Sequence, residues 1–222
     1  MIKSRALLFD LDGTFVDTAP DLVGILNQLL REDGRPPLPY AAGRNVVSRG
    51  AIALLRRGYG EDMAAEKEAE LRDRFLRNYQ LHPHNNSTFF IELNGLYDVM
   101  HELHARWGIV TNKPTDLTNS LFERLAMSQP PECIVCGDTL ATRKPDPATL
   151  LHAAKLVDSV PERSIYVGDS SIDIRAGRAA GMTTIAAAYG YIHPSDDIDA
   201  WGADAIIRHP SELVPLLKQL WK

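Results

Sequence analysis

Aspartates follow two of the short apolar segments in this sequence. Asp10 and Asp12 come two positions apart in "LLFDLDGT", and Asp169 and Asp173 belong to "VGDSSID". Carboxylates can act as a nucleophile, as an acid or base, and as ligands for a hard divalent cation. Two unit charges 4 Å apart repel by about 4 kcal/mol at an effective dielectric constant near 20. A cluster of these groups is therefore expected only around cations, namely Lys144 of "RKPDP" and a metal ion.

Apolar runs alternate with helical patterns along most of the chain. The runs that end in polar or small residues are "RALLFD", "WGIVTN", "CIVCGD", "SIYVGD", "TTIAAA" and "ADAIIR". The helical patterns cover Leu96–Ala105, Thr115–Leu125, Pro147–Leu156, Asp173–Ala180 and Ser211–Leu220. This alternation predicts an α/β fold with a Rossmann-like parallel sheet and helices on both faces. Because functional groups gather at the carboxyl ends of such strands, Asp10, Thr111 and Asp169 should converge.

One interval, between Asp12 and Thr111, is far longer than the dozen or so residues that a crossover needs. It contains three helical patterns, at Asp21–Asp33, Val47–Arg57 and Met63–Asn78. A loop is expected at Gly34–Gly43, and "HPHNNST" (His82–Thr88) should return the chain to the sheet. We therefore predict a helical cap domain at residues 16–88, inserted into a core domain of residues 1–15 and 89–222. The expected hinges between the two domains are Thr14–Thr18 and Asn85–Thr88.

Composition excludes several classes of protein. The chain has 222 residues, 45% of them hydrophobic and 24% charged, as in an ordinary globular protein. Its net charge of -5 gives no basic footprint for nucleic acid. The first apolar run is too short for a signal peptide or a membrane span, so we expect a cytoplasmic protein. Cys133 and Cys136 form a C-x-x-C without a second Cys/His pair nearby, and we interpret them as core residues.

Four motifs together resemble the haloacid dehalogenase superfamily, in particular its phosphatase branch. They are D-x-D-G-T from Asp10, the strand-end Thr111, Lys144 in K-P-D-P, and G-D-x-x-x-D ending at Asp173. The resemblance covers nearly the whole chain, and the helical insert looks like the small cap of that superfamily. "DLDGTFVDTAPDL" and "TNKP" are most similar to phosphoglycolate phosphatases. Phe15 departs from the usual leucine, for which we expect only an adjustment of packing.

This resemblance implies a Mg²⁺-dependent phosphomonoesterase that hydrolyses a small phosphorylated metabolite through an aspartyl-phosphate. Asp10 would be the nucleophile, and Asp12 would donate a proton to the leaving group and then act as the base for water. Negative neighbours should help Asp12 to keep its proton. Lys144 would neutralise charge on the nucleophile and the phosphate. The metal ligands would be Asp10, the Asp12 carbonyl and Asp169, with Asp173 orienting the groups around the ion.

Substrate contacts are also implied. Thr111, Asn112 and backbone N–H groups near Gly13 would bind the transferring oxygens. The cap loop "VSRGA" would reach the rest of the substrate, and Arg49 would either pair with a substrate carboxylate or remain a surface charge. The late segment "YGYIHPSDDIDAWGAD" is similar to a sub-branch that dephosphorylates N-acetylmuramic acid 6-phosphate. Its polar residues either contact substrate or lie in a surface loop: His193, Asp196 and Asp197.

Other functions remain open at this stage. A carbon–halogen dehalogenase is disfavoured because a halide leaves no alkoxide for Asp12 to protonate. A sugar phosphomutase would use the same acid and base. A phospho-accepting receiver module would lack the helical insert, and a catalytically inactive scaffold would be expected to lack a motif residue. No nucleic-acid or membrane partner is expected, and the chain is predicted to be a monomer or a homodimer.

Overall fold

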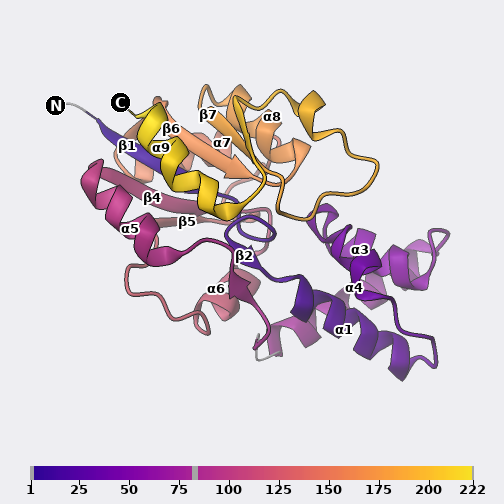
Figure 1. Ribbon diagram of the computed structural model, residues 1–222. Coiled ribbons are helices and arrows are strands. Elements are labelled where there is room, and N and C mark those ends of the chain that lie inside the picture. The colour runs from indigo at the N-terminus through magenta and orange to yellow at the C-terminus, as the bar shows by residue number, and fades with distance from the viewer. Residues whose placement is uncertain (1–2, 82–84, 222) are drawn as a thin grey trace.

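A computed structural model describes residues 3–81 and 85–221 of the chain. It has two parts, a sheet flanked by helices and a smaller group of helices beside one end of that sheet (Figure 1). β1 begins and α9 ends at the end of the sheet away from the smaller part (Figure 1). His82, Pro83 and His84, which the sequence assigns to the return from the cap, lie outside the described residues.

The central sheet contains six parallel strands in the order β5-β4-β1-β6-β7-β8. The predicted α/β fold is therefore confirmed, and each predicted strand is present with ends shifted by a few residues. The largest shift is in β6, which begins earlier than its apolar run. The strands are β1 (Ser4–Phe9), β4 (Ala105–Val110), β5 (Cys133–Val135), β6 (Ser159–Gly168), β7 (Thr183–Ala187) and β8 (Ala205–Ile207).

Helices cover both faces of this sheet, as the alternating sequence predicts. α5 (Leu93–Glu102) and α9 (Leu213–Leu220) pack on one face, and α7 (Ala148–Leu156) and α8 (Ser171–Ala179) pack on the other. Side chains of β1 alternate between the two layers, since Leu7 and Phe9 join the first cluster and Ala6 and Leu8 the second. α6 (Thr115–Phe122) follows β4, and two short 3-10 helices, η2 (Ile198–Trp201) and η3 (Pro210–Glu212), flank β8.

The smaller part is built from the insert and has a hydrophobic cluster of its own. Its elements are α1 (Ala19–Glu32), α2 (Tyr40–Arg44), η1 (Val47–Arg49), α3 (Ala51–Tyr59) and α4 (Ala65–Leu81). Side chains of α1, α3 and α4 form the cluster, including Leu26, Leu55 and Phe75. This arrangement supports the prediction of a cap at residues 16–88, and we use that name for it.

Two predicted elements of the cap are wrong in detail. The predicted loop Gly34–Gly43 contains the start of α2. The predicted helix Val47–Arg57 is divided into η1 and α3 at Gly50, whose φ of 87° lies outside the helical region. Glycine adopts this conformation without the steric penalty that a Cβ would impose, so the chain can turn sharply there.

Two short strands join the cap to the core at the predicted hinges. β2 (Val16–Asp17) and β3 (Thr88–Phe89) pair antiparallel, with Val16 opposite Phe89. The buried Asp21 on α1 accepts a hydrogen bond from Ser87 Oγ at 2.6 Å, which ties the start of the cap to its return segment. The two connections therefore lie side by side, as a hinge requires.

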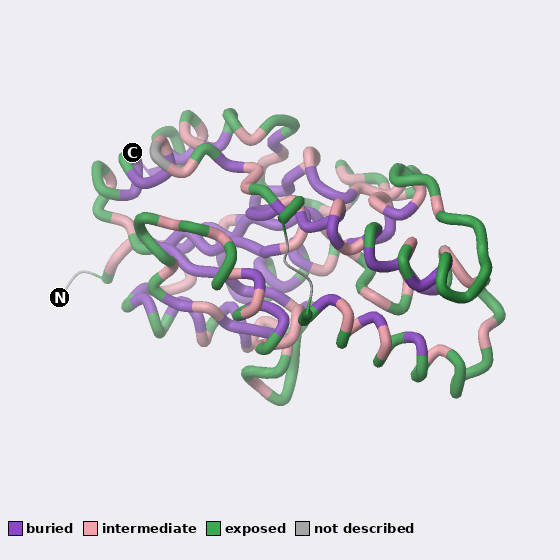
Figure 2. Tube along the Cα trace, turned by 90° about the horizontal axis from the view of Figure 1, so that it is seen from below, coloured by how far each residue is buried: buried purple, intermediate pink, exposed green. Residues whose placement is uncertain are grey.

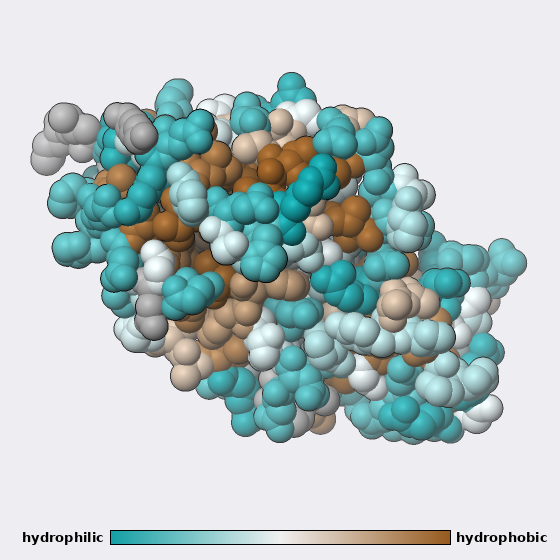
Figure 3. Space-filling model, viewed as in Figure 1, coloured by the Kyte–Doolittle hydropathy of each residue, from teal (hydrophilic) through white to brown (hydrophobic). Residues whose placement is uncertain are grey.

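Burial follows the same division. Figure 2 shows buried backbone along the central strands and exposed backbone at the outer turns. In Figure 3, hydrophilic and near-neutral side chains dominate the visible face of the cap, whereas hydrophobic ones gather over the core. Among the described residues, no helix is both long enough and apolar enough to cross a lipid bilayer.

Phe15, within the predicted first hinge, lies in an aromatic cluster directly before β2. It is completely buried, and its ring centroid lies 5.2 Å from that of Trp107, 5.4 Å from that of Phe9 and 5.5 Å from that of Phe89. Such contacts contribute about 0.5–1.5 kcal/mol each beyond simple burial. The aromatic ring at this position is therefore part of the packing between the sheet and the hinge.

Phe15→Leu should lower the free energy of unfolding by about 1–2 kcal/mol, because leucine fills part of the volume but makes none of the ring contacts. Chemical denaturation followed by circular dichroism measures the change. Phe89→Leu, at a partly buried rim position, is the matched control and should cost less. Unchanged stability of Phe15→Leu would contradict this account.

Candidate active site

A cavity of about 190 Å³ lies between the carboxyl ends of the strands and the cap. Its floor carries the predicted polar residues, namely Asp10, Asp12, Thr111, Asn112, Lys144, Asp169 and Asp173. Its roof comes from the cap and is largely apolar, with Leu22, Val47, Phe75 and Leu76. The cavity is therefore polar at one end and hydrophobic at the other.

The floor forms because three neighbouring strands end at the same level. β1 lies between β4 and β6, and Phe9 is level with both Ile109 and Val167. Each strand is followed at once by a polar residue, so Asp10, Thr111 and Asp169 meet, as predicted. The backbone N–H of Asp10 donates to Val167 O at 2.9 Å and fixes the first of them.

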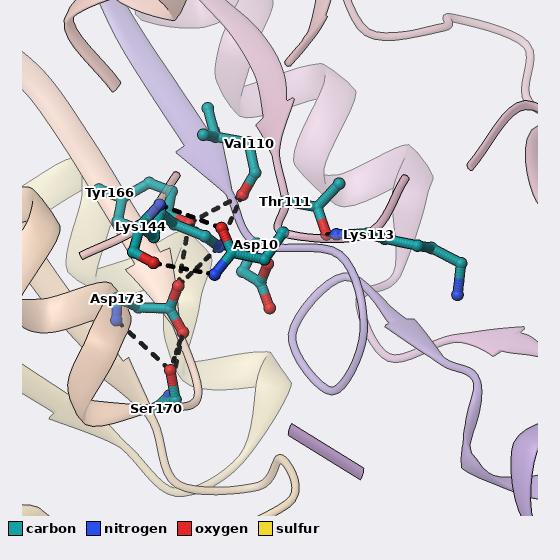
Figure 4. A network of polar contacts seen from close by, with 9 residues as sticks. Asp10, Val110, Thr111, Lys113, Lys144, Tyr166, Ser170 and Asp173 are labelled. Atoms are coloured by element: carbon teal, nitrogen blue, oxygen red, sulfur yellow. Dashed lines mark hydrogen bonds and ion pairs between the residues drawn. The ribbon is translucent and has the colours of Figure 1, made fainter. Parts of the chain in front are cut away.

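Lys144 is the centre of a buried polar network (Figure 4). Its Nζ lies 2.7 Å from Asp10 Oδ1, 2.7 Å from Asp173 Oδ1 and 2.7 Å from the hydroxyl of Tyr166. Burial alone would lower the pKa of this lysine, but Asp10 and Asp173 outweigh burial and the pKa is raised. Lys144 therefore stays charged and binds the two carboxylates together.

The acidic groups remain crowded despite this lysine. Asp10, Asp169 and Asp173 each offer a carboxylate oxygen within 4.8 Å of the others. Burial raises the pKa of Asp10 to about 7, opposed by Lys144 and reinforced by Asp173. Burial, followed by the charges of Asp10 and Asp173, raises the pKa of Asp169 well above its usual value. Full ionisation of the cluster thus requires more positive charge than Lys144 supplies.

One carboxylate oxygen of Asp169 is available to bind that additional positive charge. Its Oδ2 accepts a hydrogen bond from the backbone N–H of Tyr191 at 2.8 Å, but its Oδ1 is buried with no hydrogen-bond partner. A buried carboxylate oxygen without a partner is costly, and a hard divalent cation with oxygen ligands would satisfy it. The donor set therefore fits a divalent metal ion at Asp10 and Asp169.

Asp173, the other predicted metal residue, is already fully engaged. Its Oδ1 accepts from Lys144, and its Oδ2 accepts from Ser170 Oγ at 2.6 Å and from the Ser170 N–H at 3.1 Å. The bond from the Ser170 N–H belongs to a capping box that starts α8, in which the Asp173 N–H donates to Ser170 Oγ at 3.4 Å in return. This arrangement favours the orienting role that we expected for Asp173 over direct ligation.

Asp12 has a cationic partner that the sequence analysis missed. Lys113 Nζ lies 3.0 Å from Asp12 Oδ1 and 2.9 Å from the hydroxyl of Tyr79 on α4, and Thr18 Oγ1 donates to the same Asp12 oxygen at 2.6 Å. Burial would lower the pKa of Lys113, but Asp12 and Tyr79 raise it. Asp12 therefore has a basic neighbour in addition to the acidic ones that the sequence suggested. The position of Lys113 in "TNKP", two residues after the strand-end Thr111, was the sequence signal for this partner.

Two predicted phosphate-binding groups are occupied within the protein. The Asn112 side-chain amide bonds the backbone of Lys144 twice, through Nδ2 to Lys144 O at 3.0 Å and through Oδ1 to Lys144 N at 3.1 Å. The Gly13 N–H donates to Val16 O at 2.9 Å. Gly13 has a φ of 89°, and a Cβ there would lie 2.1 Å from Asp169 Oδ2. In this conformation both residues position their neighbours, while Thr111 lines the cavity.

The cap residue predicted for substrate binding lies elsewhere. Arg49 is exposed, and its Nη2 pairs with Asp196 Oδ1 at 2.8 Å on the outside of the cap loop. Arg49 and His193 line a separate surface hollow, and Asp197 is exposed. None of these residues lines the cavity that contains Asp10.

The two cysteines are core residues, as predicted. Both are buried, and they form no disulfide. Burial and then Glu132 raise the pKa of the Cys133 thiol to about 11, so it stays protonated and unreactive at neutral pH.

Comparison with known proteins agrees with this geometry. The family model described as "Haloacid dehalogenase-like hydrolase" matches residues 7–187. The chain belongs to the haloacid dehalogenase-like hydrolases. It is 38% identical to an N-acetylmuramic acid 6-phosphate phosphatase of Pseudomonas aeruginosa, over 97% of this chain and 96% of the relative. It is 39% identical to a phosphoglycolate phosphatase of Xanthomonas campestris, over 94% of each protein.

A crystal structure of a predicted phosphoglycolate phosphatase from Haemophilus somnus has the same fold, with a TM-score of 0.77, 23% identity and coverage of 98% of this chain and 99% of that one. The expected phosphatase of the haloacid dehalogenase family is thus confirmed at the level of family and fold. Enzymes of this family generally use a divalent metal ion, in keeping with the acidic cluster.

Asp169→Asn should raise the melting temperature of the metal-free protein at neutral pH. A carboxyl whose pKa is raised on folding stabilises the fold below its unfolded pKa of about 3.9, and that contribution is lost as pH rises through the folded pKa. Thermal unfolding with EDTA at pH 7.5 should show an increase of about 2–6 °C. The increase should shrink as the pH is lowered toward about 4.

With magnesium present, the wild-type protein should have the higher melting temperature, because only the wild-type protein gains stability by binding the ion. Asp98→Asn, an exposed substitution on α5, is the control and should change neither measurement. A lower melting temperature for Asp169→Asn in EDTA would contradict the account of a buried charge that needs a cation.

Proposed function

We propose that this protein is a Mg²⁺-dependent phosphomonoesterase that hydrolyses a small phosphorylated metabolite through an aspartyl-phosphate on Asp10. The observation that carries the proposal is the buried Asp169 Oδ1, which has no hydrogen-bond partner, on a carboxylate that lies within 4.8 Å of those of Asp10 and Asp173. Family membership supports the reaction class. Mg²⁺ suits an all-oxygen donor set.

Asp10 acts as the nucleophile in this proposal. One of its carboxylate oxygens attacks phosphorus, the bond to the leaving oxygen breaks, and a mixed anhydride forms on Asp10. Lys144, bound to Asp10 Oδ1, keeps the nucleophile oriented and offsets the negative charge that builds up. When bound, Mg²⁺ at Asp10, the Asp12 carbonyl and Asp169 supplies the positive charge that allows a phosphate dianion to approach.

Asp12 moves the protons. It gives a proton to the alkoxide oxygen as that bond breaks. It later takes a proton from the water that attacks phosphorus, the bond between phosphorus and the Asp10 oxygen breaks, and inorganic phosphate and the free Asp10 carboxylate are released. Thr18 and Lys113 both hold Asp12 Oδ1, so we assign proton transfer to Oδ2. Thr111 is placed in the cavity to bind a phosphoryl oxygen, with Asn112 and Gly13 supporting the site through the contacts described above.

The cap, residues 16–88, serves as a lid that keeps bulk water from the phosphorylated aspartate. Its apolar roof faces the leaving group of the substrate. A cytoplasmic location, the absence of nucleic-acid and membrane partners, and the choice between monomer and homodimer remain predictions.

Two substrate classes follow from the relatives, 2-phosphoglycolate and N-acetylmuramic acid 6-phosphate. Arg49 was the expected partner for the carboxylate of the former, yet its guanidinium pairs with Asp196. The cations that line the cavity, Lys113 and Lys144, are each bound to aspartates. Because N-acetylmuramic acid 6-phosphate also carries a carboxylate, on its lactyl group, these ion pairs do not distinguish the two candidates. The apolar roof suits the sugar ring of the amino-sugar phosphate, which we keep as an equal candidate.

Asp10→Asn should abolish release of inorganic phosphate, because the amide cannot attack phosphorus. EDTA should do the same to the wild-type protein, and added Mg²⁺ should restore turnover. Asp98→Asn is the matched control and should keep full activity. An active Asp10→Asn protein, or one insensitive to EDTA, would overturn the proposal, and isomer formation in place of phosphate release would indicate a phosphomutase.

Arg49→Ala should change kcat/KM by less than about threefold for both 2-phosphoglycolate and N-acetylmuramic acid 6-phosphate, since exposed ion pairs contribute little. Arg57→Ala, on the same face of the cap, is the control. A loss of at least about tenfold with either substrate would show instead that Arg49 turns inward to bind the carboxylate of that substrate.

A further inference from the structure

Residues 189–196, which we name the strap, leave the end of β7 and cross to the cap. The strap is part of the core chain, yet the ring of Tyr191 is completely buried in the hydrophobic cluster of the cap. The ring also lies beneath the guanidinium of Arg44, whose Cζ is 5.0 Å from its centroid. Tyr191 therefore packs with the lid while its backbone stays beside the floor of the active site.

The backbone of the strap holds Asp169. The Tyr191 N–H donates to Asp169 Oδ2 at 2.8 Å, which leaves Oδ1 as the oxygen without a partner. Gly190 permits this approach, because a Cβ there would lie 2.4 Å from both Asp169 Cβ and Gly13 O. The orientation of Asp169 thus depends on where the strap lies.

The hydroxyl of Tyr191 holds the hinge of the cap. It donates to Asp17 Oδ1 at 2.8 Å and accepts from the N–H groups of Thr18 at 2.6 Å and Ala19 at 2.8 Å. Thr18 is the N-cap residue of α1, but its own hydroxyl bonds Asp12 and caps nothing. Tyr191 therefore supplies, from across the fold, the acceptor that the first turn of α1 needs.

The cap loop completes the connection. Arg44 donates to Gly190 O at 3.0 Å and to Tyr189 O at 3.1 Å, and Ser48 Oγ donates to Tyr191 O at 3.0 Å. Together with the ion pair between Arg49 and Asp196, these bonds fasten the strap to the cap. Movement of the cap as a whole would therefore pull on the strap.

We propose that Tyr191 is a positioning residue that couples the orientation of Asp169 to the position of the cap. The inference rests on the proposed function, because it takes Asp169 as a metal ligand. Since such coupling is reciprocal, binding of a divalent cation should tighten the hinge, and a tight hinge should favour cation binding. A merely structural tyrosine would stabilise the fold without linking the two.

The effect of Tyr191 on cation binding can be tested without substrate. The metal-free protein is titrated with Mn²⁺, and the free ion is measured by electron paramagnetic resonance. Tyr191→Phe keeps the ring and the backbone N–H but loses all three hydroxyl contacts. It should bind Mn²⁺ about threefold to tenfold more weakly. Tyr189→Phe is the matched control in the same strap, since its hydroxyl donates only to Thr14 O, and it should change binding by less than about twofold.

Amide hydrogen exchange tests whether cation binding tightens the hinge of the cap. In the wild-type protein and in Tyr189→Phe, Mn²⁺ should slow exchange in the peptide that contains Thr18 and Ala19, and in Tyr191→Phe this slowing should disappear. Asp17→Asn, which alters the carboxylate that accepts from the Tyr191 hydroxyl, is a second variant and should shift both readouts in the same direction as Tyr191→Phe.

Equal Mn²⁺ affinity and equal metal-dependent protection in wild type and Tyr191→Phe would overturn the coupling and leave the proposed function standing. A wild-type protein that binds no Mn²⁺ would overturn both proposals. Weaker binding by Tyr191→Phe together with an equal loss in Tyr189→Phe would assign the effect to general loosening of the strap and would also overturn the specific role of Tyr191.

Discussion

The crowding of buried carboxylates around Lys144 is the constraint on which the rest of this structure depends. One ammonium group binds Asp10 and Asp173, yet the pKa of Asp10 and that of Asp169 remain raised. The folded chain therefore accepts an electrostatic cost at neutral pH that a uniformly satisfied core would not have. Such a cost is typical of sites where a cation and an anionic substrate complete the balance.

The parallel sheet makes this crowding possible. Three adjacent strands end at one level, and each delivers a polar residue to the same point. Close approach then requires residues without side chains, and Gly13 and Gly190 stand where a Cβ would collide with Asp169. Tyr166 and Asn112 hold Lys144, and Ser170 holds Asp173, so these groups orient the polar residues of the floor.

The cap contacts this site through polar residues as well as through its apolar roof. Tyr79 on α4 contacts Lys113, which contacts Asp12, and Thr18 at the hinge bonds the same aspartate. On the other side, the strap reaches from Asp169 to the start of α1 through Tyr191. The polar floor and the cap are thus connected at both ends of the acidic cluster.

The sequence by itself determined the order of strands and helices, the place of the helical insert and the aspartates and lysine of the floor, because these depend on local periodicity and on short motifs. It did not reveal the division of the predicted Val47–Arg57 helix at Gly50, which depends on backbone conformation. Only the tertiary structure decided that Lys113 pairs with Asp12, that Arg49 turns to Asp196, and that Tyr191 caps a helix distant in the chain. Those partners lie about 100 or more residues apart, and contacts at such separations are set by how the layers pack.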